Sequence, residues 1–305
     1  MDLRHLTLFC TLLLTACDQT WTPSVVGEAP APATSEPITL GQSYTLMSDV
    51  FGGPREINVY VPDLPGWADG YFDDPLPVLY VVDGGLEQDF IHLAGLSHLP
   101  LINAERSPAI IVGVKTDDRY GEITPEPTDP RYIAEFEGYG GADTFRRFLR
   151  DEVQPFVRSL GHTGRPALIG ESLAGLFVLD TLAAEPDLFD DYIAISPSSW
   201  WDDRKLAKSA TETLADTPIG KRLVLAMANE GGTMEMGTLA FRDAAAADPA
   251  ITLSFLDRSG SESHSTIYHD AARDALILLH GIAAEPYGDM PWYLIEGEEP
   301  PTDTP

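Results

Sequence analysis

The sequence contains few basic residues. Its 305 residues include 19 Lys and Arg against 48 Asp and Glu, which gives a formal net charge of −29 at pH 7. Proteins bind nucleic acids through clustered Lys and Arg that neutralise phosphates and release counterions. We therefore expect no nucleic-acid partner. Such an excess of acid keeps a surface strongly hydrated, which is typical of a saline habitat and equally of an acidic exported protein.

Cysteine is also scarce, and Cys10 and Cys17 are the only two in the chain. No Cys/His cluster has the spacing of a zinc site, so we predict no metal and no organic cofactor. If Cys10 is removed with a signal peptide and Cys17 is lipidated, the mature chain retains no thiol for a disulfide. The domain is then expected to depend on its hydrophobic core for stability.

The apolar run at the N-terminus, Leu6 to Leu14, is too short to span a bilayer as a stable helix. Preceded by Arg4, it is typical of the central region of a signal peptide. The run closes on Leu14-Thr15-Ala16-Cys17, which resembles the bacterial lipobox, where the cysteine thiol is lipidated and becomes the new N-terminus. We predict that residues 1–17 are a lipoprotein signal peptide with its lipobox and that Cys17 is the lipidation site. The alternative is an ordinary cleaved signal with an incidental cysteine.

The predicted lipid implies a location for the protein. A lipidated Cys17 would anchor it in the bacterial cell envelope, on the periplasmic side, with the lipid as its only contact with the membrane. Asp18 follows this cysteine and resembles an inner-membrane retention signal of Gram-negative lipoproteins.

Polar and proline-rich segments flank the part of the chain that has a hydrophobic pattern. Residues 18–37 are rich in Pro, Ala, Ser, Thr and Glu, and we predict that they form a flexible tether. Residues 296–305 hold four acids and three prolines and are predicted to form a disordered tail. The region between them, 38–295, contains no internal repeat and is predicted to be one domain. Nothing in it requires more than a monomer.

Strand-like and helix-like segments alternate within this region. Eight short runs of apolar and β-branched residues are predicted strands: Tyr44–Met47, Ile57–Val61, Pro77–Val82, Ala109–Val114, Pro166–Ile169, Tyr192–Ile195, Leu223–Met227 and Ile251–Leu256. A turn at Gly52-Gly53-Pro54 is predicted between the first two, and helical periodicity is clearest in 142–159, 173–182 and 267–280. Apolar strands with helices between them indicate the α/β class, with a mostly parallel central sheet of about eight strands and helices on both faces.

The segment Gly170-Glu171-Ser172-Leu173-Ala174-Gly175 places a serine among small residues between a predicted strand and a predicted helix. A nucleophile on such a tight turn has a strained backbone and needs small neighbours. The turn exposes the hydroxyl above the sheet edge and directs helix N-terminal amides towards it. We predict that Ser172 is the nucleophile of an α/β-hydrolase fold, although Ala174 stands where the usual pattern Gly-x-Ser-x-Gly has glycine.

Two backbone amides of this fold stabilise the oxyanion of an acyl-transfer intermediate. One belongs to the residue after the nucleophile, which is Leu173 here. The other belongs to the loop after the third strand, Asp83-Gly84-Gly85, where glycines allow a close approach to the substrate. Gly84 or Gly85 is the predicted second donor, and a simple tight turn is the alternative for this loop.

The catalytic base of this fold is a histidine that follows the last strand. His264 lies in a polar loop between the final predicted strand and the final predicted helix, and it is the predicted base. His269 is the competitor, but it falls within that helix and is less free to reach Ser172. His280 ends an apolar helical face and is expected to be packed.

The catalytic acid should precede the histidine and lie at the carboxyl end of a strand. Glu230 follows the predicted strand Leu223–Met227 and is the predicted acid. It would accept a hydrogen bond from Nδ1 of His264 and so fix the tautomer of the ring. Asp257 and Glu262 are the alternatives.

With this serine turn, histidine and acid, the chain resembles an esterase family of the α/β-hydrolases, which includes siderophore trilactone esterases, S-formylglutathione hydrolases and mycolyltransferases. The resemblance runs from about Tyr44 to His280. The stretches that resemble the siderophore-esterase branch are Val78–Gly84, Arg119–Pro125, Gly140–Phe145 and Ile195–Trp201. The resemblance implies that the acid is weak or dispensable in such enzymes.

The same resemblance suggests residues that contact the substrate. Trp200 and Trp201 are expected to wall an aromatic or acyl pocket, with core tryptophans as the alternative. Arg119 is expected to meet an anionic ligand, with a solvated loop arginine as the alternative. Glu171 departs from the family, which usually has histidine there, and a carboxylate beside the nucleophile would disfavour anionic substrates.

These features together predict a serine esterase that hydrolyses carboxylic esters through an acyl-serine intermediate. Its substrates would be small molecules such as siderophore lactones or other acyl esters. One alternative is an acyltransferase with sugar or lipid acceptors, which product analysis with added alcohols would distinguish. The other is a non-catalytic envelope binding protein on a hydrolase scaffold, whose serine would not react with a fluorophosphonate.

Overall fold

A computed structural model of the chain describes residues 34–282. The predicted signal peptide with Cys17, most of the predicted tether and the predicted tail at 296–305 lie outside these residues. Among the helices described, none is long and apolar enough to cross a membrane.

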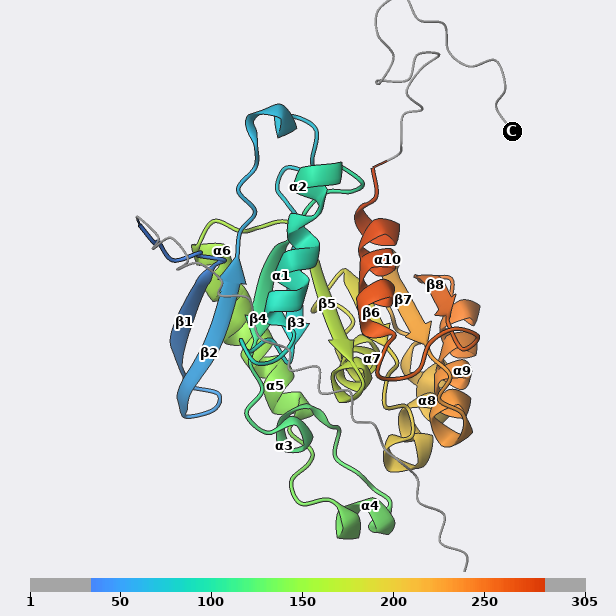
Figure 1. The fold of residues 1–305 in the computed structure, drawn as a ribbon. Helices are drawn as coiled ribbons and strands as arrows, with labels where there is room; N and C mark the ends of the chain where they lie inside the picture. The colour runs from blue at the N-terminus through green and yellow to red at the C-terminus, as the bar shows by residue number, and fades with distance from the viewer. Residues whose placement is uncertain (1–33, 283–305) are drawn as a thin grey trace, which may run out of the picture. The chain divides into compact units, whose positions relative to one another are not determined.

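Eight strands form one sheet in the order β1-β2-β4-β3-β5-β6-β7-β8 (Figure 1). Their bounds are β1 Gln42–Ser48, β2 Gly53–Tyr60, β3 Val78–Val82, β4 Ile110–Val114, β5 Pro166–Glu171, β6 Asp191–Ile195, β7 Lys221–Met227 and β8 Ile251–Asp257. β2 pairs antiparallel with β1 and with β4, and every other pairing is parallel. The predicted mostly parallel sheet of about eight strands is confirmed.

The predicted first turn is wrong in one detail, because Gly53 and Pro54 belong to β2. They pair with Ser48 and Met47 of β1. β4 joins the other side of β2 only from Ile57 onward. Pro54 thus lies where β2 has a single neighbouring strand, a position at which the missing N–H of proline is tolerated.

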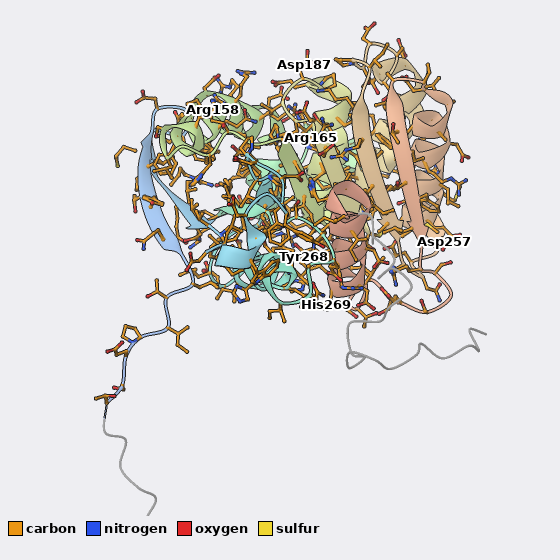
Figure 2. The ribbon with its side chains drawn as sticks, turned by 90° about the horizontal axis from the view of Figure 1, so that it is seen from above. Arg158, Arg165, Asp187, Asp257, Tyr268 and His269 are labelled. Atoms are coloured by element: carbon orange, nitrogen blue, oxygen red, sulfur yellow. The ribbon has the colours of Figure 1, made fainter. Side chains whose placement is uncertain are left out.

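Helices cover both faces of the sheet. Their bounds are α1 Phe90–His98, α2 Pro100–Asn103, α3 Arg119–Ile123, α4 Pro130–Glu135, α5 Ala142–Phe148, α6 Gln154–Ser159, α7 Leu173–Ala184, α8 Trp201–Thr213, α9 Gly232–Ala247 and α10 Tyr268–His280. Helices α1 and α10 bury apolar residues against one face, and helices α5 to α9 bury theirs against the other. Arg158 of α6 and Tyr268 of α10 accordingly lie on opposite sides of the sheet (Figure 2).

Alternation along the strands produces these two cores. In β3, Val78, Tyr80 and Val82 contribute to one core, while Leu79 and Val81 contribute to the other. Successive side chains of a strand point to opposite faces, so a strand buried on both faces is apolar throughout. The helix predicted at 142–159 is present as α5 and α6, joined by a π-helical turn at Leu149–Val153.

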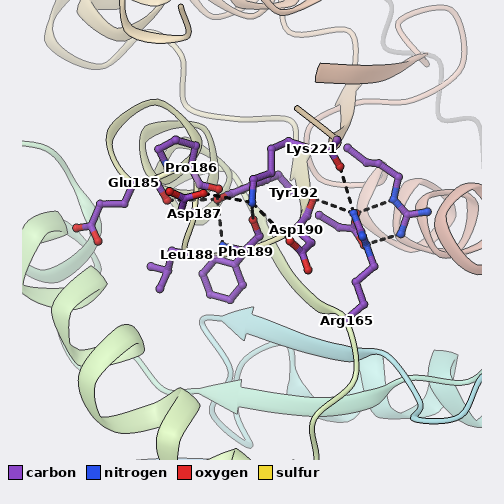
Figure 3. A network of polar contacts seen from close by, with 12 residues as sticks. Arg165, Glu185, Pro186, Asp187, Leu188, Phe189, Asp190, Tyr192 and Lys221 are labelled. Carbon is purple, nitrogen blue, oxygen red and sulfur yellow. Dashed lines mark hydrogen bonds and ion pairs between the residues drawn. The ribbon is translucent and has the colours of Figure 1, made fainter. Parts of the chain in front are cut away.

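A network of ion pairs and hydrogen bonds holds the amino ends of the central strands (Figure 3). Asp191, the first residue of β6, is fully buried and accepts bonds from Arg165 at 2.9 Å and from Arg222 at 2.5 and 2.6 Å. Lys221 donates to the Phe189 carbonyl at 2.8 Å. Burial alone would raise the pKa of Asp191, but the bonds from the two arginines outweigh it and lower the pKa below its usual value.

We predict that Asp191→Asn lowers the free energy of unfolding at pH 7 by about 3 kcal/mol, because it removes the buried charge that Arg165 and Arg222 both pair with. The pKa of Asp191 is lowered on folding, so its contribution is present above the unfolded value of about 3.9 and is lost as the pH falls through the folded value. Urea unfolding at pH 7 and at pH 3 measures the difference, which should shrink at pH 3.

The matched control is Asp187→Asn, since Asp187 belongs to the same network but its side chain is 86% exposed. It should change the stability by less than about 1 kcal/mol. An Asp191→Asn effect as small as this control would contradict the assignment of Asp191 as the ion that stabilises this edge.

Candidate active site

Ser172 lies on the sharp turn between β5 and α7. Its φ of 59° and ψ of −117° are strained for a residue with a side chain. Its amide donates to the Ile195 carbonyl of β6 at 3.0 Å, which ties the turn to the neighbouring strand. A Cβ on Gly170 would lie 2.5 Å from the carbonyl carbon of Ala174, and a Cβ on Gly175 would lie 2.9 Å from the Ile195 oxygen. Glycine is therefore needed at 170 and 175, whereas the methyl group of Ala174 fits.

His264 approaches this serine from the loop between β8 and α10. Its Nε2 lies 3.1 Å from Oγ of Ser172, a distance at which the hydroxyl donates to the ring. The two competing histidines are elsewhere. His269 lies at the start of α10, bonded to His92 at 3.0 Å (Figure 2), and His280 is buried, which lowers its pKa to about 4.

The other ring nitrogen of His264 has two acceptors. Nδ1 lies 3.0 Å from Oγ of Ser196 and 3.4 Å from Oε1 of Glu230. The Glu230 side chain is only 2% exposed, and within the described residues its Oε2 has no hydrogen-bond partner. The hydrogen bond with Glu230 raises the pKa of His264 above its ordinary value despite burial of the ring. The shorter distance to Ser196 makes the hydroxyl the closer acceptor, while only Glu230 supplies charge.

The two alternative acids are bonded to groups other than His264. Asp257 accepts bonds from the amide and the hydroxyl of Ser259, and Glu262 pairs with Arg258 at 3.0 Å. The structure thus brings Ser172, His264 and Glu230 together at the carboxyl ends of β5, β7 and β8.

The loop after β3 requires a correction to the predicted oxyanion donors. The Gly84 amide already donates to the Val114 carbonyl at 2.9 Å, and a Cβ at Gly84 would lie 2.2 Å from the Val114 amide nitrogen. Gly84 therefore serves the close packing of this loop against β4. The Gly85 amide donates to Oε1 of Gln88 at 2.8 Å. Leu173 begins α7, where first-turn amides have no acceptor within the helix.

The predicted substrate residues separate into exposed and buried ones. Trp201 is 3% exposed and donates through Nε1 to the Pro125 carbonyl at 3.0 Å, which favours the core-tryptophan alternative over a direct substrate contact. Trp200 is partly exposed and stacks on Tyr132, with ring centroids 6.1 Å apart. The guanidinium of Arg119 is paired with Asp83 at 2.6 Å.

Acidic side chains gather next to Ser172. Burial and the neighbouring Asp89 raise the pKa of Glu171 to about 7, and burial together with Asp83 raises the pKa of Asp89 to about 6. Tyr268, at the start of α10 (Figure 2), is buried, and burial together with the neighbouring Asp89 and Glu171 raises the pKa of its hydroxyl. No group of three or more His, Cys, Asp or Glu within residues 34–282 is arranged to hold a metal ion.

Ser196 and Ser198 are two residues of the site that the motif analysis did not single out. Both follow β6, the strand next to the nucleophile turn, and Oγ of Ser198 lies 3.3 Å from Oγ of Ser172. The signal that would have found them is the carboxyl end of the adjacent parallel strand, where functional groups of such sheets gather.

Known proteins resemble this chain in sequence and in fold. The siderophore triacetylfusarinine C esterase of Aspergillus fumigatus is 33% identical over 188 residues, which cover 58% of this chain and 61% of the relative. The ferri-bacillibactin esterase of Bacillus subtilis is 28% identical over 194 residues, 55% of this chain and 62% of the relative. The chain thus spans less than two thirds of the length of these curated relatives.

A solved structure with the same fold is that of an IroE-like serine hydrolase from Shewanella oneidensis. It is 26% identical, with a TM-score of 0.66, and the match covers 78% of this chain and 79% of that one. The family described as "Putative esterase" matches residues 48–271, more than half of the chain and the whole stretch from Ser172 to His264. This chain therefore belongs to the Putative esterase family of the α/β-hydrolases.

Proposed function

We propose that this protein is a serine esterase that hydrolyses carboxylic esters through an acyl-serine intermediate. The observation that carries the proposal is the line of contacts from Ser172 through His264 to Glu230, at 3.1 and 3.4 Å. A hydroxyl within reach of a ring nitrogen, whose other nitrogen is held by an acid, is the arrangement that activates a serine.

The reaction follows from these positions. Oγ of Ser172 attacks the ester carbonyl carbon while its proton moves to Nε2 of His264. The C–O bond to the alcohol then breaks, and the alcohol leaves with the proton from His264. Water, deprotonated in turn by His264, attacks the acyl-serine and releases the carboxylic acid and the free serine.

Backbone amides stabilise the oxyanion in both halves of this reaction. Leu173 supplies one donor at the start of α7, and Gly85 supplies the second when the oxyanion replaces Oε1 of Gln88. One such donor contributes roughly 3 kcal/mol to the transition state in comparable sites.

The relatives direct the substrate proposal towards siderophore esters. The partly exposed ring of Trp200, stacked on Tyr132 and tilted against Phe136, offers an aromatic wall two residues from Ser198. Glu171 directly precedes Ser172, and the carboxylates of Asp89 and Asp83 lie near enough to Glu171 to raise its pKa. This charge favours neutral esters over anionic ones.

The first test is hydrolysis of p-nitrophenyl acetate and butyrate by the wild type, Ser172→Ala and His264→Ala. Each substitution removes a group that the reaction needs in every turnover, so activity should fall by about 10³ or more with folding intact. Labelling by a fluorophosphonate should disappear in Ser172→Ala and remain in Ser198→Ala, a matched serine 3.3 Å away. A wild type that neither hydrolyses these esters nor takes up the label would support the binding-protein alternative.

A second prediction separates the two acceptors at Nδ1 of His264. Glu230→Gln should reduce kcat/KM at pH 8 by about tenfold or more, because the imidazolium loses its charged partner. It should also move the acid limb of the pH profile to lower pH, since Glu230 raises the pKa of His264 and the base works only when neutral.

Ser196→Ala is the matched variant, because it removes the closer acceptor without removing charge. It should leave the acid limb where the wild type has it. Profiles of kcat/KM from pH 5 to pH 9 measure both effects, and an unshifted limb in Glu230→Gln would show that Glu230 is not the acid.

The proposal also places the enzyme in the bacterial cell envelope, anchored by lipid at Cys17 on the periplasmic side. Its support is the lipobox-like Leu14-Thr15-Ala16-Cys17 after a short apolar run. In a bacterial host given radiolabelled palmitate, the full chain should be labelled and fractionate with membranes, while Cys17→Ser should be unlabelled. Equal labelling of the two chains would rule out this anchor.

A further inference from the structure

Asp202 binds a segment that lies far from it in the sequence. Its buried carboxylate, 3% exposed, accepts hydrogen bonds from the Thr128 amide at 2.9 Å, the Thr128 hydroxyl at 3.0 Å and the Asp129 amide at 2.7 Å. Thr128 and Asp129 directly precede α4. We call residues 125–136, which contain α4, the α4 cap. Figure 1 shows α4 beyond the sheet edge to which the arrowheads of β5 and β7 point.

The backbone at Asp202 is held in an unfavourable conformation. Asp202, Asp203 and Arg204 have φ values of 47°, 50° and 61°, so three consecutive residues with side chains are left-handed. Residues other than glycine adopt this conformation only where their surroundings impose it. From this backbone the Asp202 carboxylate contacts the α4 cap, and it also pairs with Lys205 of α8 at 3.6 Å.

Further contacts join the same two segments near the nucleophile. The Tyr132 hydroxyl of α4 donates to the Trp200 carbonyl at 2.8 Å. The rings of Tyr132 and Phe136 lie against Trp200, with centroids 6.1 and 6.0 Å apart. Trp200 comes two residues after Ser198, which contacts Ser172. The position of the α4 cap therefore decides whether Tyr132 and Phe136 lie against Trp200.

We propose that Asp202 is a positioning residue for substrate binding, because it holds the α4 cap so that Tyr132 and Phe136 complete an aromatic wall with Trp200. The inference rests on the proposed esterase activity at Ser172. A bulky acyl group reaches this wall and gains affinity from it, whereas an acetyl group is too small to reach it. Asp202 thus sets the preference between large and small esters without touching the reacting atoms.

The test compares Asp202→Asn with the wild type on p-nitrophenyl acetate and p-nitrophenyl 4-phenylbutyrate, which share a leaving group and differ in acyl size. Asparagine tolerates left-handed backbone, so the strain is unchanged. Its Oδ1 can still accept from one of the two amides, of Thr128 or Asp129, but the NH₂ group that replaces the second oxygen cannot accept from the other. We expect KM for the phenylbutyrate to rise about tenfold relative to the wild type. The kcat values for both esters and KM for the acetate should stay within about twofold of the wild-type values.

Asp203→Asn is the matched control. Asp203 has the same left-handed backbone, but its carboxylate pairs with Lys208 at 2.8 Å and reaches the cap only through exposed Arg131 at 3.8 Å. This contact is of the exposed kind that contributes little. The control should leave both KM values unchanged. Equal losses on the two esters in Asp202→Asn, or the same selectivity change in Asp203→Asn, would overturn the proposal.

Limited trypsin digestion gives a readout that does not need activity. Cleavage after Arg131, within the α4 cap, should be several-fold faster in Asp202→Asn than in the wild type or Asp203→Asn. If the wild type hydrolyses neither ester, the proposed esterase function fails, and the digestion still decides whether Asp202 holds the cap. Unchanged cleavage in Asp202→Asn would show that it does not.

Discussion

The strained turn at Ser172 is the constraint on which the rest of the site depends. Its φ of 59° persists because the Ser172 amide is bonded to the Ile195 carbonyl and because Gly170 and Gly175 allow the backbone segments to approach closely. The same contacts bring the end of β6 next to the turn. The loop that follows β6 then carries Ser196 to the histidine, Ser198 to the nucleophile and Trp200 to the α4 cap. One unfavourable conformation thus fixes the positions of three further functional side chains.

The parts of the site that could be predicted from the sequence are those with a local physical signature. Continuous apolar runs identify strands buried on both faces, and a serine among small residues between strand and helix identifies the nucleophile turn. The contact of His264 with Ser172 and Glu230 could be predicted because chain order and strand ends restrict where a base and an acid of this fold lie. In each case a few adjacent residues contain the information.

The parts that could not be predicted depend on contacts between distant segments. Gly84 and Gly85 cannot be distinguished in the sequence. Only the packing of their loop against β4 shows that the Gly84 amide is bonded to the Val114 carbonyl. Adjacent Trp200 and Trp201 differ because Pro125, far away in sequence, accepts the indole N–H of only one of them. Helix α4 has six residues, too few for local propensity to stabilise a helix, so tertiary contacts decide its conformation.

The two edges of the sheet respond to pH in opposite directions. At the amino edge the pKa of Asp191 is lowered, so its ionisation stabilises the fold above its unfolded pKa, and this stabilisation is lost as the pH falls. At the carboxyl edge the pKa of Glu171 is raised to about 7, so the fold loses stability as the pH rises from about 4.5 through 7 and this carboxyl ionises. As the proposed base, His264 must be neutral to act, so the proposed reaction would run where Glu171 is increasingly ionised and this edge of the sheet is weakened. At that pH the Asp191 network at the opposite edge makes its full contribution and offsets part of this loss.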